Sequence, residues 1–268
     1  MESERSNFDA LWQEIAELVL PRQADFTVKR SEGEVRTTKI FDSTASQMLD
    51  QGIANFVSHV MPRGTRYQML EPKDEALFSL QHVMQWYELK TTQLLALRHD
   101  SRSGFINQSN ESVASLLAFG PQAMWIDLRR DRVTGRPIGF RYKSEHVGSV
   151  WIDEDFQGNV FRTHRKFQLT AEAALKKWKD KLPALVMRAA QDPKRSADKF
   201  TFIQRIEPNP MPIPGRLDYK GRFWLSAYLC CEAQQVFDQG GYDSNPLIYS
   251  RFTQAPNEKY ARSPAVTV

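Results

Sequence analysis

The 268-residue sequence has only two cysteines, Cys230 and Cys231, and they are neighbours. Adjacent cysteines lack the spacing that a disulfide framework or a tetrahedral metal site requires. The sequence therefore predicts neither feature, and it favours a reducing compartment.

Long hydrophobic runs are also missing. The first apolar stretch, Leu11 to Leu20, is interrupted by Glu14 and Glu17 and is not followed by a small-residue cleavage pattern, which argues against a signal peptide. No other run approaches the length of a membrane span. We expect no membrane contact and a location in the cytoplasm of the cell that makes the protein.

A strong excess of charge of one sign is absent as well. Lys and Arg total 36 against 32 for Asp and Glu, which gives a formal net charge of +4. This charge is small for the length of the chain, so any contact with nucleic acid should be local or indirect.

The sequence lacks the short motifs that mark several enzyme classes. It contains no Walker A loop, dinucleotide fingerprint, GxSxG or HExxH pattern. The histidines are scattered, with no pair four residues apart, so structural or surface roles are expected rather than metal ligation; they are His59, His82, His99, His146 and His164. We predict no enzymatic activity, no catalytic or metal site and no cofactor.

An acidic segment imitates two kinds of site. Asp153, Asp155 and Gly158 resemble the start of a calcium loop, but the expected liganding Glu is missing, since residues 161–163 are Phe, Arg and Thr. Asp153, Glu154 and Asp155 also suggest paired catalytic carboxylates, yet neighbours at a strand end point in different directions. A polar hairpin tip is the favoured interpretation, and a hydrolase at Asp153 and Asp155 is the least favoured hypothesis.

Three basic clusters allow an alternative function, that of a stand-alone nucleic-acid-binding protein. Acidic residues are interleaved with them and no cluster combines bases with stacking aromatics, so solvated faces are favoured and the DNA-facing residues are left unknown. The clusters are Arg129, Arg130 and Arg132; Arg162, Arg165 and Lys166; and Lys176, Lys177, Lys179 and Lys181.

Residues 1–120 are predicted to form a mainly helical region. Apolar residues recur at helical spacing in four segments. The first covers residues 8–19 after an N-cap at Ser6 or Asn7, and the second extends to Val60 after an N-cap at Asp42 or Ser43. The third covers about residues 74–98, and the fourth covers 104–119 and ends at Gly120. Tyr67 to Leu70 is expected to be a short extended segment.

Residues 121–268 are predicted to form an α+β region with antiparallel strands and interspersed helices. Apolar segments bounded by Gly, Pro and Asp indicate strands near 124–126, 140–142, 147–152, 160–169, 200–206, 223–231 and 247–252. A helix capped by Thr170 and a second helix after Pro183 interrupt them. The proline-rich segment 208–215 and Gly240-Gly241 are expected to separate strands.

Aromatic side chains make up 11% of the sequence and hydrophobic residues 41%, enough for a substantial core. Several aromatic residues could instead anchor a partner, but their helical and strand spacing favours packing in the core. They are Trp12, Phe56, Trp86, Tyr87, Trp125 and Trp151.

Four motifs, in order along the chain, resemble the head-to-tail connector (portal) family of short-tailed bacteriophages. The first combines Trp12-Gln13-Glu14-Ile15 and Pro21 with Arg36-Thr37-Thr38-Lys39-Ile40-Phe41-Asp42-Ser43-Thr44, and the second is Met61-Pro62-Arg63-Gly64-Thr65-Arg66-Tyr67. The third comprises Phe119-Gly120 through Trp125, then Tyr142, Trp151 to Asp155, Gly158 to Val160, Arg162 to Ala173, and Trp178. The fourth comprises Gly240-Gly241-Tyr242, Asn245-Pro246, Arg251-Phe252 and Glu258 to Ala265, with Ala261 and Ser263 where the family pattern has glycine.

This resemblance implies a structural subunit of a ring at one capsid vertex, through which double-stranded DNA passes. The family's rings contain about twelve subunits joined by contacts between two different faces. The implied partners are the terminase packaging ATPase, then the tail, with capsid and scaffold proteins, and the implied location is the virion, with assembly in the host cytoplasm. Because family members continue beyond the Pro264-Ala265 match, we expect this chain to correspond mainly to the outer, wing-like region.

Overall fold

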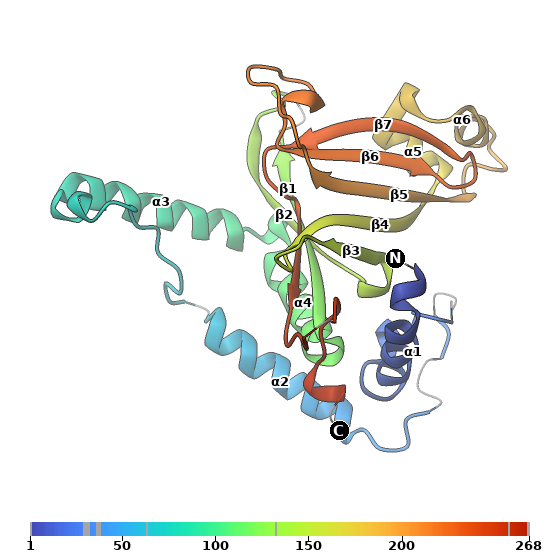
Figure 1. Cartoon of the computed structure of the whole chain (residues 1–268), viewed down its shortest axis with the longest axis horizontal. Coiled ribbons are helices and arrows are strands. Elements are labelled where there is room, and N and C mark those ends of the chain that lie inside the picture. Colours follow the sequence, from blue (N-terminus) through green and yellow to red (C-terminus); the bar gives the residue numbers. More distant parts are fainter. Residues whose placement is uncertain are drawn as a thin grey trace. The chain divides into compact units, whose positions relative to one another are not determined.

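The computed structural model describes residues 2–28, 33–35, 39–62, 64–131, 133–256 and 258–266. The chain forms two compact units (Figure 1). The sheet unit comprises Met1–Asn7 and His146–Leu247, and the helical unit comprises Phe8–Glu145 and Ile248–Val268.

The helical unit contains four α-helices and a three-stranded sheet. The helices are α1 (Glu2–Val19), whose first residues belong to the sheet unit, α2 (Thr44–Val60), α3 (Gln81–His99) and α4 (Phe105–Phe119). The sheet has the order β2-β1-β8, formed by β1 (Pro121–Arg130), β2 (Pro137–Glu145) and β8 (Leu247–Arg251). Short 3₁₀ turns lie at η1 (Pro21–Gln23), η2 (Glu75–Ser79), η3 (Ser101–Ser103) and η7 (Pro264–Val266).

The four expected helices are confirmed, with two differences at their starts. α1 begins at Glu2 rather than after Ser6 or Asn7. The helix expected from residue 74 is divided, because the Asp74 side chain accepts the Ala76 N–H at 3.0 Å and starts the separate turn η2. At α2, the Asp42 carboxylate accepts the Thr44 N–H, also at 3.0 Å, which supports the predicted start of that helix. Tyr67 to Leu70 has no regular secondary structure.

The core of the helical unit is aromatic. Trp12 and Phe119 are completely buried, and the Trp12 indole N–H donates to the Phe119 carbonyl at 3.0 Å. The Tyr260 ring packs edge-on against Trp12 with centroids 5.6 Å apart. A buried indole needs such a hydrogen-bond acceptor, because an unpaired polar group in the core is costly.

Gly120 brings the third and fourth sequence motifs together. Its φ is +98°, and a Cβ built there would lie 2.6 Å from the Arg262 carbonyl carbon and 2.7 Å from the Ala261 oxygen. The Gly120 carbonyl accepts the Phe252 N–H at 2.8 Å, and the Ser263 hydroxyl donates to the Ala118 carbonyl at 2.7 Å. Only glycine permits this close approach of two backbones.

The sheet unit is a five-stranded antiparallel sheet in the order β3-β4-β5-β6-β7. The strands are β3 (Val150–Glu154), β4 (Val160–Thr170), β5 (Lys199–Pro208), β6 (Trp224–Cys230) and β7 (Gln235–Tyr242). The helices α5 (Ala171–Trp178) and α6 (Ala184–Gln191) lie beside it, and the turns are η4 (Val147–Ser149), η5 (Lys179–Lys181) and η6 (Tyr219–Gly221).

One face of this sheet packs against α5 and α6. The Trp178 ring lies 5.0 Å from Phe202 and 5.2 Å from both Tyr228 and Phe237, measured between ring centroids. The Thr170 hydroxyl accepts the Ala173 N–H at 3.3 Å, which confirms the predicted N-cap of α5. The cluster of aromatic rings forms the core that holds the helices to the sheet.

Arg5 attaches the start of α1 to the beginning of the sheet. The side chain is only 2% exposed and its guanidinium donates to the carbonyls of Val147, Gly148 and Val150. It also lies 4.1 Å from the centre of the Trp151 ring. These contacts are why residues of the N-terminal helix belong to the sheet unit.

The expected strand separation at Gly240-Gly241 is wrong, because both glycines lie inside β7. A Cβ at Gly241 would lie 2.6 Å from the Arg222 Cβ and 2.8 Å from the Trp224 carbonyl oxygen. The glycine therefore serves close packing within the sheet rather than a turn.

The α+β fold class is confirmed, with a helical N-terminal part followed by antiparallel strands. The change from helix to strand occurs at Gly120 to Pro121, as expected. The division into domains 1–120 and 121–268 stays a prediction.

Candidate assembly surface

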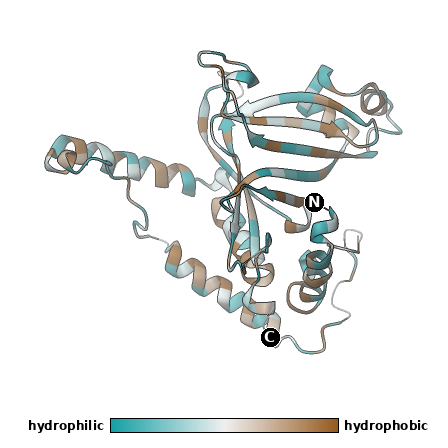
Figure 2. Ribbon diagram, viewed as in Figure 1, coloured by the Kyte–Doolittle hydropathy of each residue, from teal (hydrophilic) through white to brown (hydrophobic). Residues whose placement is uncertain are grey.

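Helix α3 has two apolar sides, and only one of them is covered by the rest of the helical unit. Thr91 is the single buried residue of this 19-residue helix. Because an α-helix turns by about 100° per residue, Val83, Tyr87 and Leu94 lie with Thr91 on one side. Brown, apolar segments alternate with teal, polar ones along α3 (Figure 2), so apolar residues also occur outside the covered side.

The covered side of α3 packs against residues 64–72, here called the strap. The Leu70 N–H donates to the Thr91 Oγ1 at 3.0 Å, and that hydroxyl donates to the Tyr87 carbonyl at 2.8 Å. Arg66 forms an ion pair with Glu88 at 2.9 Å. These bonds hold the strap along the helix and satisfy the polar groups that it buries.

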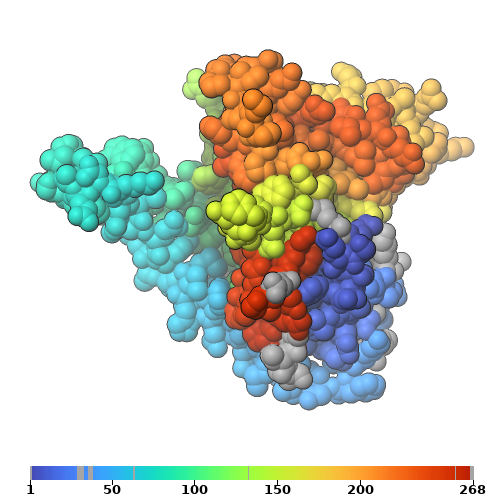
Figure 3. All heavy atoms as spheres, viewed as in Figure 1, coloured from blue at the N-terminus to red at the C-terminus, as the bar shows by residue number. Residues whose placement is uncertain are grey.

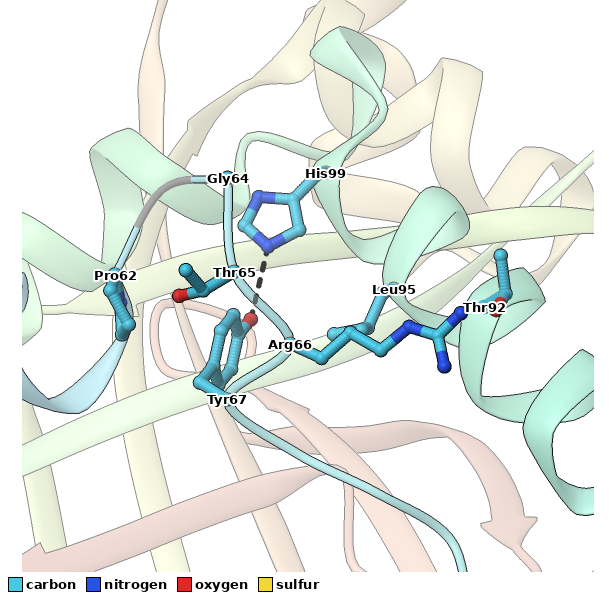
Figure 4. A pocket seen from close by; sticks show the side chains of 8 residues that line it. All are labelled: Pro62, Gly64, Thr65, Arg66, Tyr67, Thr92, Leu95 and His99. Atoms are coloured by element: carbon cyan, nitrogen blue, oxygen red, sulfur yellow. Dashed lines mark hydrogen bonds between the residues drawn. The ribbon is translucent and has the colours of Figure 1, made fainter.

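A pocket of about 270 Å³ lies where the strap meets the end of α3 (Figure 4). The Tyr67 hydroxyl and the His99 Nε2 are 3.0 Å apart across it. Its volume falls just below the usual range for small-molecule sites, about 300 to 1,000 Å³. It is lined by Pro62, Gly64, Thr65, Arg66, Tyr67, Thr92, Leu95 and His99.

The outer side of α3 carries the outer stripe, defined here as Trp86, Leu89 and Leu97. These side chains are 53%, 53% and 40% exposed, and their spacing places them on one side of the helix. Phe78 and Leu80, just before the helix, are also exposed. A contiguous row of exposed apolar side chains is a candidate contact surface for another protein.

Asp100 anchors the junction between α3 and α4. Its carboxylate accepts a hydrogen bond from Arg129 Nη2 at 2.8 Å and from the Arg102 N–H at 2.9 Å. The bond from the Arg129 guanidinium, followed by the contacts with Arg102, holds the pKa of Asp100 well below its usual range. The junction therefore depends on an ionised carboxylate.

The histidines predicted to be structural lie on different elements of the described chain. His59 and His82 are exposed on α2 and α3, and His99 faces Tyr67. The His146 Nδ1 accepts the Gly148 N–H at 3.1 Å. His164 lies on β4 opposite Arg205, and burial, then Arg205 and Arg162, lower its pKa. Among the described residues, no group of three or more His, Cys, Asp or Glu is arranged to hold a metal ion.

The acidic segment forms the predicted hairpin tip between β3 and β4. The Asp155 carboxylate accepts the N–H groups of Gln157 and Asn159 at 2.9 and 2.8 Å, which closes the turn. Asp153 instead contacts Arg162 on the neighbouring strand at 3.4 Å. The two carboxylates thus have separate structural partners.

The arginines of the first two basic clusters that the structure describes are hydrogen-bonded or ion-paired within the chain, and one of them is buried. Arg129 pairs with Asp100, and Arg130 donates to the Gly135 carbonyl, while Arg132 lies outside the described residues. Arg165 is 7% exposed and donates to Gln204, whereas Arg162 pairs with Glu207.

Three of the four lysines on and after α5 have partners within the chain. Lys176 pairs with Glu172 and Lys181 with Asp238, at 2.6 and 2.7 Å. Lys177 lies 4.3 Å from the centre of the Trp178 ring. These partners neutralise or cover much of the positive charge that the sequence suggested for phosphate contact.

The prediction that the aromatic side chains pack in the core is correct for Trp12 and Trp125, which are buried, and wrong for Trp86, which is exposed. Phe56, Tyr87 and Trp151 are half-buried. Helical spacing predicted the side of α3 on which Trp86 lies but not whether this chain covers it. The signal that could have identified the surface is the presence of apolar residues on two sides of one helix.

Cys230 is buried and Cys231 half-buried, and both are free thiols. Of the motif residues, Arg36 to Thr38 and Arg63 lie outside the described part of the chain. No helix of the described residues is long and apolar enough to cross a membrane.

The described residues form an α+β fold in which the outer stripe of α3 is exposed. The chain belongs to a family described as bacteriophage head to tail connecting protein, whose model matches residues 1–268. The family is structural, and its members are parts of the virion. No curated protein sequence matches this chain significantly.

Proposed function

We propose that this chain is a portal subunit, one of about twelve that close into a ring around a DNA channel at a capsid vertex. The family match over the whole chain carries this proposal. In this role the ring docks the terminase packaging ATPase during DNA entry and the tail afterwards, with assembly in the host cytoplasm alongside capsid and scaffold proteins.

The surface chemistry of α3 supports this role. Ring closure requires each subunit to present two different complementary faces. The outer stripe exposes large apolar side chains that the described helical unit leaves uncovered, and burying such side chains between subunits is favourable.

Electron microscopy of the purified chain tests the proposal. We expect ring-shaped particles with a central channel and binding of the terminase subunit to one rim. Isolated monomers that bind DNA in a salt-dependent manner, and lose binding when Arg130 and Lys179 are neutralised, would instead support a nucleic-acid-binding protein.

A further inference from the structure

The strap and α3 form one arm of the helical unit, defined here as residues 64–99. Arg98 donates to the Gln68 side chain at 2.5 Å, in addition to the bonds that Leu70 and Arg66 make with the helix. Because these bonds are spread along the strap, the strap and the helix should move together. The space-filling view shows this part of the chain, in blue-green, as a lobe that projects from the rest of the helical unit (Figure 3).

The arm is bonded to the rest of the helical unit at the C-terminal end of α3. The Ser103 hydroxyl donates to the Arg98 carbonyl at 2.6 Å. The rings of His99 and Phe105 lie edge-on to each other, with centroids 5.4 Å apart. These contacts are close to the point where α3 ends, so a small change there would alter the direction of the whole arm.

An ion pair lies at the same end of the arm. Asp100 follows α3 directly, and its carboxylate accepts a hydrogen bond from Arg129 of β1 at 2.8 Å. The side chains of Arg129 and Asp100 are 18% and 21% exposed, so water screens their attraction only in part. This bond joins the base of the arm to the three-stranded sheet.

A glycine with positive φ stands at each place where the chain passes between the arm and the rest of the unit. The chain enters the arm at Gly64, with φ +84°, and reaches α4 through Gly104, with φ +71°. An added Cβ would meet no atom within 4 Å at Gly64, and its nearest atom at 3.5 Å at Gly104. Glycine changes its backbone angles at little steric cost, and hinges are a few such positions at the ends of elements.

Open space lies next to both glycines. The pocket of about 270 Å³ beside the strap is lined by Gly64 and His99 (Figure 4). A second pocket, of about 290 Å³, is lined by His99 and Gly104. Because both pockets share His99, the two glycines lie near the same side chain. An axis through this region lets the arm turn without displacing a packed core.

We propose that residues 64–99 turn as one rigid arm about Gly64 and Gly104, and that the Asp100–Arg129 ion pair is the latch that holds the arm in one orientation. The Asp100 carboxylate also accepts the Arg102 N–H at 2.9 Å, which caps the turn η3 independently of Arg129. Breaking the latch should therefore release the arm without unfolding the junction. The outer stripe and the strap then move together. The inference does not depend on the proposed ring.

Distances between two spin labels, measured by double electron–electron resonance, test whether the arm turns. One label is attached to Gln85→Cys, exposed on α3, and the other to Arg141→Cys, exposed on β2. Cys231→Ser removes the half-buried native thiol, and Cys230 is buried. Dilution with unlabelled chain excludes distances between copies.

The latched arm should give a single narrow distance distribution. About 21 Å of helix separates Gln85 from His99, so a rotation of about 15° moves the label by about 5 Å. Asp100→Asn, and separately Arg129→Gln, should shift or broaden the distribution by at least about this amount. A distribution that is already broad with the latch intact would overturn the inference.

Glu88→Gln is the matched control, because it breaks the ion pair with Arg66 inside the arm rather than the one at its base. It should leave the distribution unchanged. Labels on Met69→Cys and Gln85→Cys both lie within the arm, and their distance should stay narrow in Asp100→Asn. Broadening of this pair would show that the strap separates from α3, and an unchanged arm in both latch variants would show that it does not turn. Either result overturns the inference.

Discussion

Helices α3 and α4 follow each other in the helical unit, yet they differ in what covers them. α4 buries seven of its 15 residues, among them Val113, Ala114 and Phe119, whereas α3 buries only Thr91 of its 19. The buried residues of α4 are mostly small, which permits close packing in the core. The large side chains of α3 are divided between the strap and solvent.

This difference separates two uses of an apolar helix. The buried side of α4 stabilises the fold of the chain itself. The outer stripe of α3 contributes little to that stability and remains able to bury area against another chain. Substitutions on the two helices should therefore have opposite consequences for folding and for assembly.

The largest effect on folding is expected from Phe119→Ala. Phe119 is fully buried and packs edge-on against Phe26 with centroids 4.9 Å apart. Its truncation should lower the free energy of unfolding by about 3 to 5 kcal/mol, measured by urea denaturation. A loss below about 1 kcal/mol would show that this end of α4 is not a packed core, since core truncations cost more than this.

Gly120→Ala should come next, with a loss of about 2 to 4 kcal/mol from backbone strain and overpacking. Gly104→Ala provides the control, because its φ is also positive, at +71°, but its nearest neighbours would lie 3.5 Å from the added Cβ. Thermal unfolding should show a clearly larger decrease in melting temperature for Gly120→Ala. Equal decreases would contradict the close approach of residues 261 and 262.

A smaller effect is expected where the strap meets α3. Thr91→Val keeps the shape of the side chain but leaves the Leu70 N–H without its acceptor, which should cost about 1 kcal/mol. Thr92→Val is the matched control, since the Thr92 hydroxyl is exposed and donates only to the Glu88 carbonyl. Hydrogen exchange of residues 66–72 should increase in the first variant alone; equal exchange in both would refute the role of Thr91.

Acid should loosen the junction between the two helices. Since the pKa of Asp100 is lowered in the folded state, its stabilisation is present above the unfolded value, about 3.9, and is lost as the pH falls through that value toward the folded pKa. Asp100→Asn should reduce the slope of stability against pH below about pH 4. An unchanged slope, measured by urea denaturation at several pH values, would contradict an ionised anchor.

The smallest effect on folding is expected from Trp86→Ser. The ring is about half exposed and rests against Tyr87, with centroids 5.0 Å apart, so the free energy of unfolding of the monomer should change by no more than about 0.5 kcal/mol. Chemical denaturation at low protein concentration measures this. A loss of several kcal/mol would mean that Trp86 belongs to the core, as its helical spacing first suggested.

The sequence predicted helices and strands well where the spacing of apolar residues fitted only one kind of element. The apolar spacing of α4 and the capping residue Thr170 identified helices, and the Asp153 to Asn159 segment identified a hairpin turn. It missed β7, because Gly240-Gly241 reads locally as a turn, while the reason for Gly241 is its contact with Arg222 and Trp224. Such contacts join residues far apart in sequence.

The exposed side of α3 was harder to predict from the sequence, because burial also depends on contacts between residues far apart in the chain. Periodicity places Trp86 on one side of α3, but burial depends on whether another segment covers that side. Likewise, the cluster at Arg129 looked free for phosphate until the structure placed Asp100 against it. Pairing of charges across the fold has no local sequence signal.

Native mass spectrometry tests most directly whether the uncovered side of α3 joins copies of this chain. The spectrum of the purified chain should show a closed oligomer of about twelve subunits, and Trp86→Ser with Leu89→Ser should shift it to the folded monomer. An oligomer of unchanged mass in that double variant would contradict the assembly role of α3.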